Sequence, residues 1–189
     1  QIRAASYQAV TGAGAAALRE LKNQLRTWAK GGNPPEPKAL PQTIAFNVFP
    51  HIGSFDSSGY SGEEIKVAQE CRKIMGLPAL KISCTTVRVP VIRGHSLALW
   101  LETKKPIDVK KCRNLLINFD GAQLLDAPKL KKYPTPCLAD SKWPVYIGRL
   151  RRGENSKELL MWVSGDNLLK GAALNSVQIA EYMIKKGFL

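Results

Sequence analysis

Arg88 and His95 are the two residues of this sequence whose types and spacing are best suited to chemistry. They stand seven positions apart in the segment CTTVRVPVIRGHS, with Gly94 directly before the histidine. An arginine guanidinium binds a carboxylate through two parallel hydrogen bonds, and an imidazole exchanges a proton near neutral pH. Because Gly94 permits an unusual backbone conformation, both side chains could point into one cleft. Each could also be an ordinary surface or core residue, and the spacing alone leaves both interpretations open.

The glycine-rich stretch TGAGAAA is a second candidate site. Gly12, Gly14 and Ala17 match the dinucleotide-binding pattern G-x-G-x-x-G/A. That loop requires a strand before it, a second parallel strand after the helix and an acidic residue about 20 positions further on. Here the helix runs into GGNPPEP and alternating strand–helix units do not follow, so we reject a nucleotide-binding loop. The glycines still permit a close backbone approach to a ligand, or simply tight packing of the helix.

The four cysteines do not have the spacing of a metal site. Cys71, Cys84, Cys112 and Cys137 are separated by 13, 28 and 25 positions, which matches neither a zinc pattern nor C-x-x-C. We therefore expect reduced, mostly buried thiols and no metal. Apolar runs such as LALWL are too short to span a bilayer, so we expect no membrane contact.

Positive charge is concentrated in one part of the chain. The formal net charge is +13, and the segment Lys104–Lys157 holds 13 Lys and Arg residues against five Asp and Glu residues. Such an excess is typical of a surface that binds nucleic acid, but also of an ordinary solvated face. Because the aromatic residues here do not form a stacking platform, we favour the solvated face and expect no specific nucleic-acid partner.

The elements that must position these residues are helices and clustered strands. Helices are predicted at about 13–28, 61–75 and 108–116, and strands at 44–50, within 80–103, at 145–151 and at 159–164. Ser61 and Glu64 have the spacing of a capping box, S-x-x-E, which fixes the start of the second helix. Because the strands cluster instead of alternating with helices, we predict an α+β fold with a mixed or antiparallel sheet.

A last helix is predicted near the end of the chain. Asp166 or Asn167 is expected to cap it, and Gly187 to end it. Its apolar residues recur at helical spacing and are expected to face inward; they are Ala173, Val177, Ala180 and Ile184.

Four segments together resemble the aspartate-semialdehyde dehydrogenase family. CTTVRVPVIRGHS is similar to its A-T-C-V-R-V-P-V-x-x-G-H-S stretch, and SYQAVTGAGAAALRELKNQ to its S-T-Y-Q-A-V-S-G-A-G segment. AFNVFPHIGSFDSSGYSGEEIKVAQECRKIM resembles the family's A-F-N-x-x-P-x-I segment followed by E-E-x-K-x-x-x-E-x-x-K-I, and GAALNSVQIAEYMI resembles its C-terminal helix. These segments follow the family's order and cover nearly all of the chain.

The resemblance implies that residues 1–189 are the catalytic and dimerisation domain of a longer, two-domain enzyme. The family's Rossmann domain for NADP and its catalytic cysteine both precede the region that matches Gln1, so the isolated chain is expected to bind no NADP and to be inactive. The implied fold is that of the C-terminal domain of glyceraldehyde-3-phosphate dehydrogenase, α+β with a mixed sheet and helices packed on one face. We expect a homodimer and leave a tetramer open. We expect the protein in the cytoplasm and leave an organelle open.

The resemblance also implies a reaction and its residues. The family uses NADPH to reduce L-aspartyl-4-phosphate, through a cysteine thioester, to aspartate 4-semialdehyde and phosphate, a step toward lysine, threonine and methionine. By similarity, His95 is the general acid and base and Gln8 positions the intermediate. Arg88 would bind the substrate carboxylate, Glu63 its ammonium group and Lys66 the phosphate. Glu63 and Lys66 are three positions apart, which places them on one helix face.

Four further residues are expected, by the same resemblance, near the nicotinamide end of the cofactor: Asn175, Gln178, Gly12 and Gly14. The family pattern has Ala-Thr-Cys where this chain has Cys84-Thr85-Thr86, so the strand cysteine is displaced by two positions. We interpret Cys84 as a packed strand residue.

Two alternatives remain open at the level of sequence. N-acetyl-γ-glutamyl-phosphate reductase shares the chemistry, although the pairing of Y-Q-A-V with R-x-P-V-x-x-G-H argues against it. A stand-alone basic module that binds nucleic acid would explain the charge, and it predicts steeply salt-dependent binding.

Overall fold

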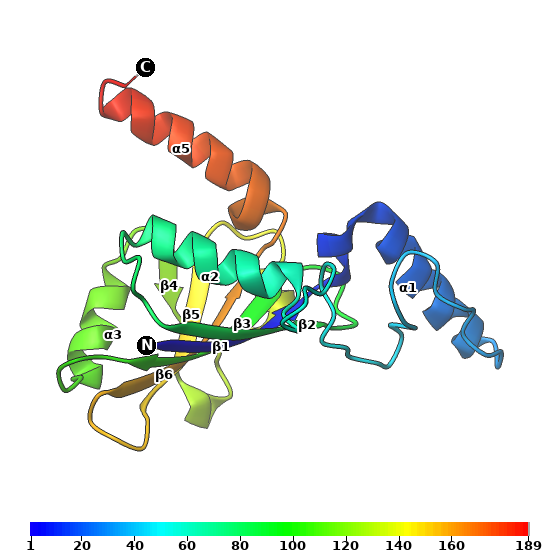
Figure 1. Cartoon of the computed structure of the whole chain (residues 1–189), viewed down its shortest axis with the longest axis horizontal. Helices are drawn as coiled ribbons and strands as arrows, with labels where there is room; N and C mark the ends of the chain where they lie inside the picture. The colour runs from blue at the N-terminus through cyan, green and yellow to red at the C-terminus, as the bar shows by residue number, and fades with distance from the viewer. Residues whose placement is uncertain (189) are drawn as a thin grey trace.

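A six-stranded mixed sheet forms the centre of the molecule (Figure 1). The computed structural model describes residues 1–188. The strands follow the order β2-β1-β3-β6-β5-β4 across the sheet. They are β1 (Ile2–Gln8), β2 (Ile82–Arg88), β3 (His95–Glu102), β4 (Ala122–Leu124), β5 (Val145–Arg152) and β6 (Glu158–Gly165). β1 pairs with β2 in parallel, as β4 does with β5, and the other pairs are antiparallel. The predicted α+β class with a mixed sheet is confirmed.

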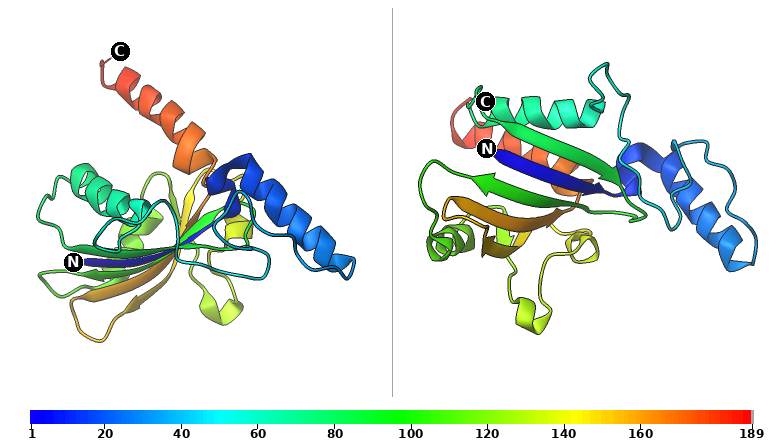
Figure 2. Two further views of the ribbon diagram at one scale, coloured as in Figure 1. Left: turned by 45° about the vertical axis from the view of Figure 1, so that its right-hand side comes forward. Right: turned by 60° about the horizontal axis from the view of Figure 1, so that its bottom comes forward.

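Some helices pack near the sheet and others extend away from it (Figure 2). They are α1 (Gly14–Ala29), α2 (Gly62–Ile74), α3 (Val109–Ile117), α4 (Pro136–Ala139) and α5 (Leu174–Lys185). A 3-10 turn, Val10–Ala13, leads from β1 into α1, and a π-helical turn, Leu169–Ala173, leads into α5. α2 and α5 lie on the same side of the sheet, whereas α1 extends away from one edge (Figures 1 and 2).

Side-chain caps confirm the predicted starts of α2 and α3. At α2 the Ser61 side chain accepts the backbone N–H of the third helical residue, and the Glu64 carboxylate accepts the Ser61 N–H at 2.9 Å. At α3 the Asp108 carboxylate accepts the N–H groups of Lys110 and Lys111. These side chains satisfy helix N–H groups that have no partner within the helix.

Burial alternates along β2, because successive side chains point to opposite faces of the sheet. Cys84, Thr86 and Arg88 are buried on the face that α2 covers, while Ser83 and Thr85 are exposed on the other. The opposite face is largely uncovered and holds a groove of about 440 Å³.

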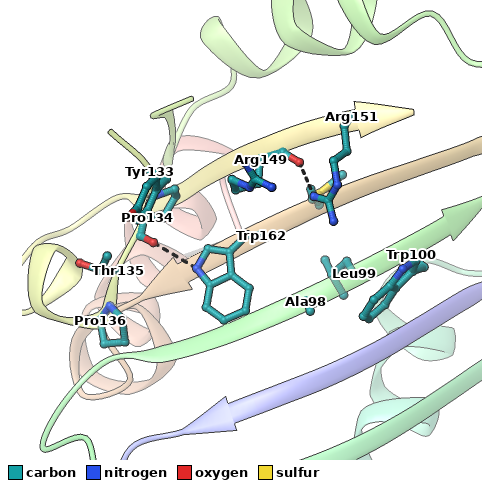
Figure 3. A pocket seen from close by; sticks show the side chains of 11 residues that line it. Ala98, Leu99, Trp100, Tyr133, Pro134, Thr135, Pro136, Arg149, Arg151 and Trp162 are labelled. Carbon is teal, nitrogen blue, oxygen red and sulfur yellow. Dashed lines mark hydrogen bonds between the residues drawn. The ribbon is translucent and has the colours of Figure 1, made fainter. Parts of the chain in front are cut away.

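Aromatic side chains line this groove (Figure 3). Trp100 and Tyr133 are 38% and 42% exposed. Trp162 lies deeper, where its indole N–H donates to the Pro134 carbonyl at 3.1 Å. An uncovered aromatic groove of this kind is a feature of surfaces that bind a partner.

The predicted strand at 44–50 is wrong. This segment is irregular, with a single bridge between Phe49 and Arg88. The N–H groups of Ile44 and Ala45 both donate to the side-chain oxygen Oε1 of Gln24 in α1, at 3.1 and 3.0 Å. Three residues of this run, Ile44, Ala45 and Phe49, are buried in a small core that also holds Ala17 and Leu21 of α1, Val10 of the 3-10 turn and the loop residue Leu40. Phe46 and Val48 of the same run are 63% and 59% exposed.

The inward face predicted for the last helix is also wrong. Val177 and Ile184 are 55% and 62% exposed, and Ala173 and Ala180 are exposed as well. α5 stands away from the sheet, so that no described part of the chain covers this face (Figure 1). Helical spacing shows that a face is apolar, but it does not show which surface covers it.

Candidate active site

The ends of three neighbouring strands lie side by side and carry three of the predicted site residues. Gln8 is the last residue of β1 and pairs with Arg88, the last residue of the parallel strand β2. β3 runs antiparallel to β1 and begins at His95. The carboxyl ends of β1 and β2 and the amino end of β3 therefore bring an amide, a guanidinium and an imidazole together.

The N-terminus of α2 adds a carboxylate and an ammonium group. Glu63 accepts a hydrogen bond from the Gln8 amide at 3.2 Å, and it accepts another from the Lys66 ammonium group at 2.9 Å. The capping box at Ser61 fixes where α2 starts and hence where Glu63 lies. All five of these side chains line one pocket of about 590 Å³.

Gly12 lies against the two central side chains. A Cβ atom at this position would be 3.0 Å from Arg88 Nη1 and 3.0 Å from His95 Cε1 and Nε2. Gly12 lines the same pocket, but its closest neighbours are protein side chains. The missing side chain therefore makes room for the arginine and the imidazole.

The backbone of Ala9 holds Arg88 and His95 together. Its carbonyl accepts a hydrogen bond from Arg88 Nη1 at 2.7 Å, and its N–H donates to His95 Nδ1 at 3.1 Å. Within residues 1–188, the buried Nε of Arg88 has no hydrogen-bond partner. A buried guanidinium with an unused donor is suited to a carboxylate ligand.

The electrostatic environment keeps His95 neutral. Burial, together with the nearby charge of Arg88, lowers the pKa of His95 to about 4. Because Nδ1 accepts the Ala9 N–H, the neutral ring carries its proton on Nε2. Nε2 lies next to Gly12, which lines the pocket, and it is the ring nitrogen that no backbone group occupies.

The Glu63–Lys66 pair is charged. Burial by itself raises the pKa of Glu63, but hydrogen bonds from Lys66 and Gln8 hold this pKa below its ordinary value. The hydrogen bond to Glu63 raises the pKa of Lys66. Burial lowers the pKa of Arg88, which stays protonated because its ordinary value is far above neutrality. The predicted residues of the pocket thus offer two cations, one anion and a neutral imidazole.

The pocket lining also includes three charged or amide side chains that were not predicted as site residues from the sequence: Asp166, Asn167 and Lys170. The Asp166 carboxylate accepts the N–H groups of Leu168 and Leu169, at the start of the π-helical turn that leads into α5. It does not cap α5 itself, which begins at Leu174 without a side-chain cap. The sequence G-D-N after a strand signals a helix cap, but it gives no sign that the strand ends beside His95.

The other predicted residues, Asn175, Gln178 and Gly14, do not line the pocket. Lys170 lines the pocket, and its ammonium group donates to Gln178 at 2.6 Å and to Asn175 at 3.3 Å. Gly14 begins α1 with a φ of +88°, and a Cβ atom there would meet nothing within 4 Å.

None of the four cysteines lines the pocket. Burial raises the pKa of the Cys84 thiol to about 11, which disfavours the thiolate needed for nucleophilic attack. Among the described residues, no three His, Cys, Asp or Glu side chains are grouped so that they could hold a metal ion. No helix of residues 1–188 is both long and apolar enough to cross a membrane.

Comparison with known proteins identifies the family. The family model for the semialdehyde dehydrogenase dimerisation domain matches residues 1–170. The chain belongs to the semialdehyde dehydrogenase family. The aspartate-semialdehyde dehydrogenase of Aquifex aeolicus is 44% identical over 185 residues, which are 97% of this chain and 54% of that protein.

Solved structures of the semialdehyde dehydrogenase family share the fold. Aspartate semialdehyde dehydrogenase II of Vibrio cholerae, complexed with ASA, has a TM-score of 0.92 and 38% identity, covering 97% of this chain and 54% of that one. The Candida albicans enzyme with NADP shares the fold at a TM-score of 0.68 and 23% identity, covering 100% of this chain and 51% of that one. The chain thus spans about half the length of the relatives it matches.

Proposed function

We propose that this chain is the substrate-binding and proton-transfer domain of an aspartate-semialdehyde dehydrogenase. In this proposal the whole enzyme reduces L-aspartyl-4-phosphate to aspartate 4-semialdehyde and phosphate. One observation carries the proposal: an unsatisfied buried arginine, a charged Glu–Lys pair and a half-buried histidine line a single pocket.

The charges of the pocket suit the charges of that substrate. Arg88 binds the α-carboxylate, because its free Nε and its planar fork match two carboxylate oxygens. Glu63 binds the α-ammonium group while it keeps its bond to Gln8. Lys66, which is half-exposed at the rim, binds the phosphate.

His95 handles the proton in this proposal. Its Nδ1 is occupied by the Ala9 N–H, so Nε2 faces the reacting oxygen and donates a hydrogen bond as negative charge develops there. Gln8 positions the intermediate from the adjacent strand. The nucleophilic cysteine comes from outside this chain, an assignment supported by the absence of any of its own cysteines from the pocket lining.

We propose NADP as the cofactor of the whole enzyme, bound mainly outside residues 1–189. When bound, it supplies the hydride. Asn175 and Gln178 approach its nicotinamide end, since both already accept from Lys170 through their oxygens and so leave their amide NH₂ groups for a carboxamide oxygen. Gly12 and Gly14 are weaker candidates for cofactor contact, because Gly12 is closely packed against Arg88 and His95.

A homodimer through the uncovered sheet face completes the proposal. The family model describes a dimerisation domain. The groove around Trp100, Tyr133 and Trp162 is the aromatic surface that such a contact would bury. The bacterial relatives support a cytoplasmic setting.

The test restores the missing half of the enzyme from the same gene. We expect NADPH formation from aspartate semialdehyde and phosphate, and we expect Arg88→Ala and His95→Ala each to lower kcat/KM by at least about 100-fold. Absence of turnover in a folded full-length enzyme, or turnover only of the N-acetylglutamate semialdehyde, would overturn the proposal.

A further inference from the structure

Asn167 connects two backbone segments that contact His95 from different sides. Its side-chain oxygen accepts the N–H of Gly94, the residue before His95, at 2.9 Å. Its side-chain NH₂ donates to the Thr11 hydroxyl at 3.1 Å. Thr11 lies in the 3-10 turn between Ala9, which donates to the imidazole, and α1. One amide therefore ties the turn to the residue that precedes the histidine.

The surroundings of Gly94 restrict its backbone to one conformation. Its φ is +92°, a conformation that glycine adopts readily and other residues rarely do. A Cβ atom at Gly94 would lie 2.9 Å from the carbonyl oxygen of Pro136. The Gly94 peptide is thus enclosed between Pro136 on one side and Asn167 on the other.

Asp166 fixes the position of Asn167. Its side chain is fully buried and accepts N–H groups from Leu168, Leu169 and Ser141 at 2.7 to 2.9 Å. Arg93 Nε forms an ion pair with the same carboxylate at 2.7 Å. A buried carboxylate with this many partners is held rigidly, and the residue next to it inherits a defined position.

We propose that Asn167 is a positioning residue for His95, acting through Gly94 on one side and Thr11 on the other. The inference rests on the proposed proton-transfer role of His95. The imidazole is held at Nδ1 by Ala9 and is in close contact with Gly12, and both belong to the segment that Thr11 anchors. Without the Asn167 bridge, this segment and Gly94 are free to move apart, and Nε2 loses its fixed direction.

The experiment uses the full-length enzyme and three substitutions. Thr11→Val removes one hydroxyl at nearly constant volume, Thr11→Ser keeps that hydroxyl, and Asn167→Ala removes both hydrogen bonds. We expect kcat to fall about tenfold in Thr11→Val and about 100-fold in Asn167→Ala, with KM for the semialdehyde within about twofold of wild type. Thr11→Ser should recover most of the activity that Thr11→Val loses.

A matched control separates positioning from general stability. Asn118 also makes a hydrogen bond through its side chain, to the carbonyl of Asn114 at 3.2 Å, but it is exposed at the end of α3. Asn118→Ala should leave kcat and KM unchanged. Wild-type kcat in Thr11→Val and Asn167→Ala would overturn the inference, as would equal losses in Thr11→Ser and Thr11→Val.

The same data distinguish failure of the inference from failure of the proposed function. If the wild-type enzyme is inactive, or if His95→Ala has no effect, the proposed function fails and the inference fails with it. If kcat falls strongly in His95→Ala but stays at the wild-type value in Thr11→Val and Asn167→Ala, only the inference is overturned. Because Thr11→Val is nearly isosteric, it keeps the test decisive even if Asn167→Ala does not fold.

Discussion

At the scale of single residues, the candidate site depends on one residue, Ala9, which contributes through its backbone alone. The Ala9 carbonyl holds Arg88 and the Ala9 N–H holds His95. The two side chains thus share one backbone anchor, which fixes the free Nε of the guanidinium and the Nε2 of the imidazole relative to each other. A residue of this kind leaves no signature in side-chain chemistry, which is why the sequence pointed to Arg88 and His95 but not to Ala9.

The protonation state of His95 is directly measurable. Because burial and Arg88 lower its pKa to about 4, the neutral ring should persist from neutral pH down to that region. The Ala9 N–H favours the tautomer with the proton on Nε2. In ¹⁵N-detected NMR of histidine-labelled protein, we expect His95 to show the Nε2–H pattern at pH 7. His51, the other histidine of the chain, serves as the internal comparison. An Nδ1–H pattern, or a titration of His95 near pH 6.5, would contradict this assignment.

Gly12 is predicted to be intolerant of a single added carbon. In Gly12→Ala the new Cβ meets Arg88 Nη1 and the His95 ring at 3.0 Å, so at least one of the two must move. We expect kcat/KM of the full-length enzyme to fall by about 100-fold while the fold is retained. Gly62→Ala is the matched control, because its Cβ would meet only the Ser54 carbonyl, at 3.7 Å. Equal activities of these two variants would show that the close approach has no functional importance.

At the scale of elements, the site is built from features that the sequence signals with unequal strength. The capping box at Ser61 fixed the start of α2, and with it Glu63 and Lys66. Pro90 and Gly94 marked the break between β2 and β3, which brings Arg88 and His95 to one edge. The pairing of β1 between these two strands is a long-range contact, and nothing local in the sequence specifies it.

The two wrong predictions have a common physical cause. In the run at 44–50, Ile44, Ala45 and Phe49 are buried against α1 without forming a strand, and the apolar face of α5 is exposed. An apolar pattern indicates that a segment packs against other residues, whereas the tertiary structure determines which residues these are. For Ile44 and Ala45 the decisive contact is the Gln24 side chain, twenty residues away, which takes the N–H groups that a strand neighbour would otherwise take.

Gln24 is therefore predicted to be a stability residue of the α1 unit. Its side chain is fully buried and its oxygen accepts both N–H groups. Gln24→Ala leaves two buried donors without a partner and should lower the free energy of unfolding by about 2–4 kcal/mol. Gln69→Ala, at an exposed position of α2, is the control and should change it by less than about 0.5 kcal/mol. Chemical denaturation of both variants tests this, and a Gln24→Ala protein as stable as Gln69→Ala would contradict the role of the bond.

At the scale of the whole molecule, two apolar surfaces lack a cover within residues 1–188. One is the face of α5 that carries Val177 and Ile184, and the other is the groove on the open side of the sheet. The match to about half the length of known relatives is consistent with a larger enzyme in which such surfaces are buried. Two residues of the basic segment, Arg149 and Arg151, line the groove, so part of the positive charge belongs to this surface.

The groove makes the final prediction specific. If two copies pack through their open sheet faces, the exposed indole of Trp100 lies inside the contact, beside the Tyr7–Trp162 pair whose ring centroids are 5.2 Å apart. Buried aromatic residues dominate the energy of such contacts, so loss of this indole removes a large part of it. Trp100→Glu should therefore weaken dimerisation by at least about 100-fold in sedimentation equilibrium. Trp143→Glu is the matched control, since Trp143 is more exposed, at 67%, and does not line the groove, so this variant should remain dimeric. A wild-type protein that stays monomeric at high concentration would contradict the dimer. A Trp100→Glu dimer as tight as the wild-type dimer would place the contact elsewhere.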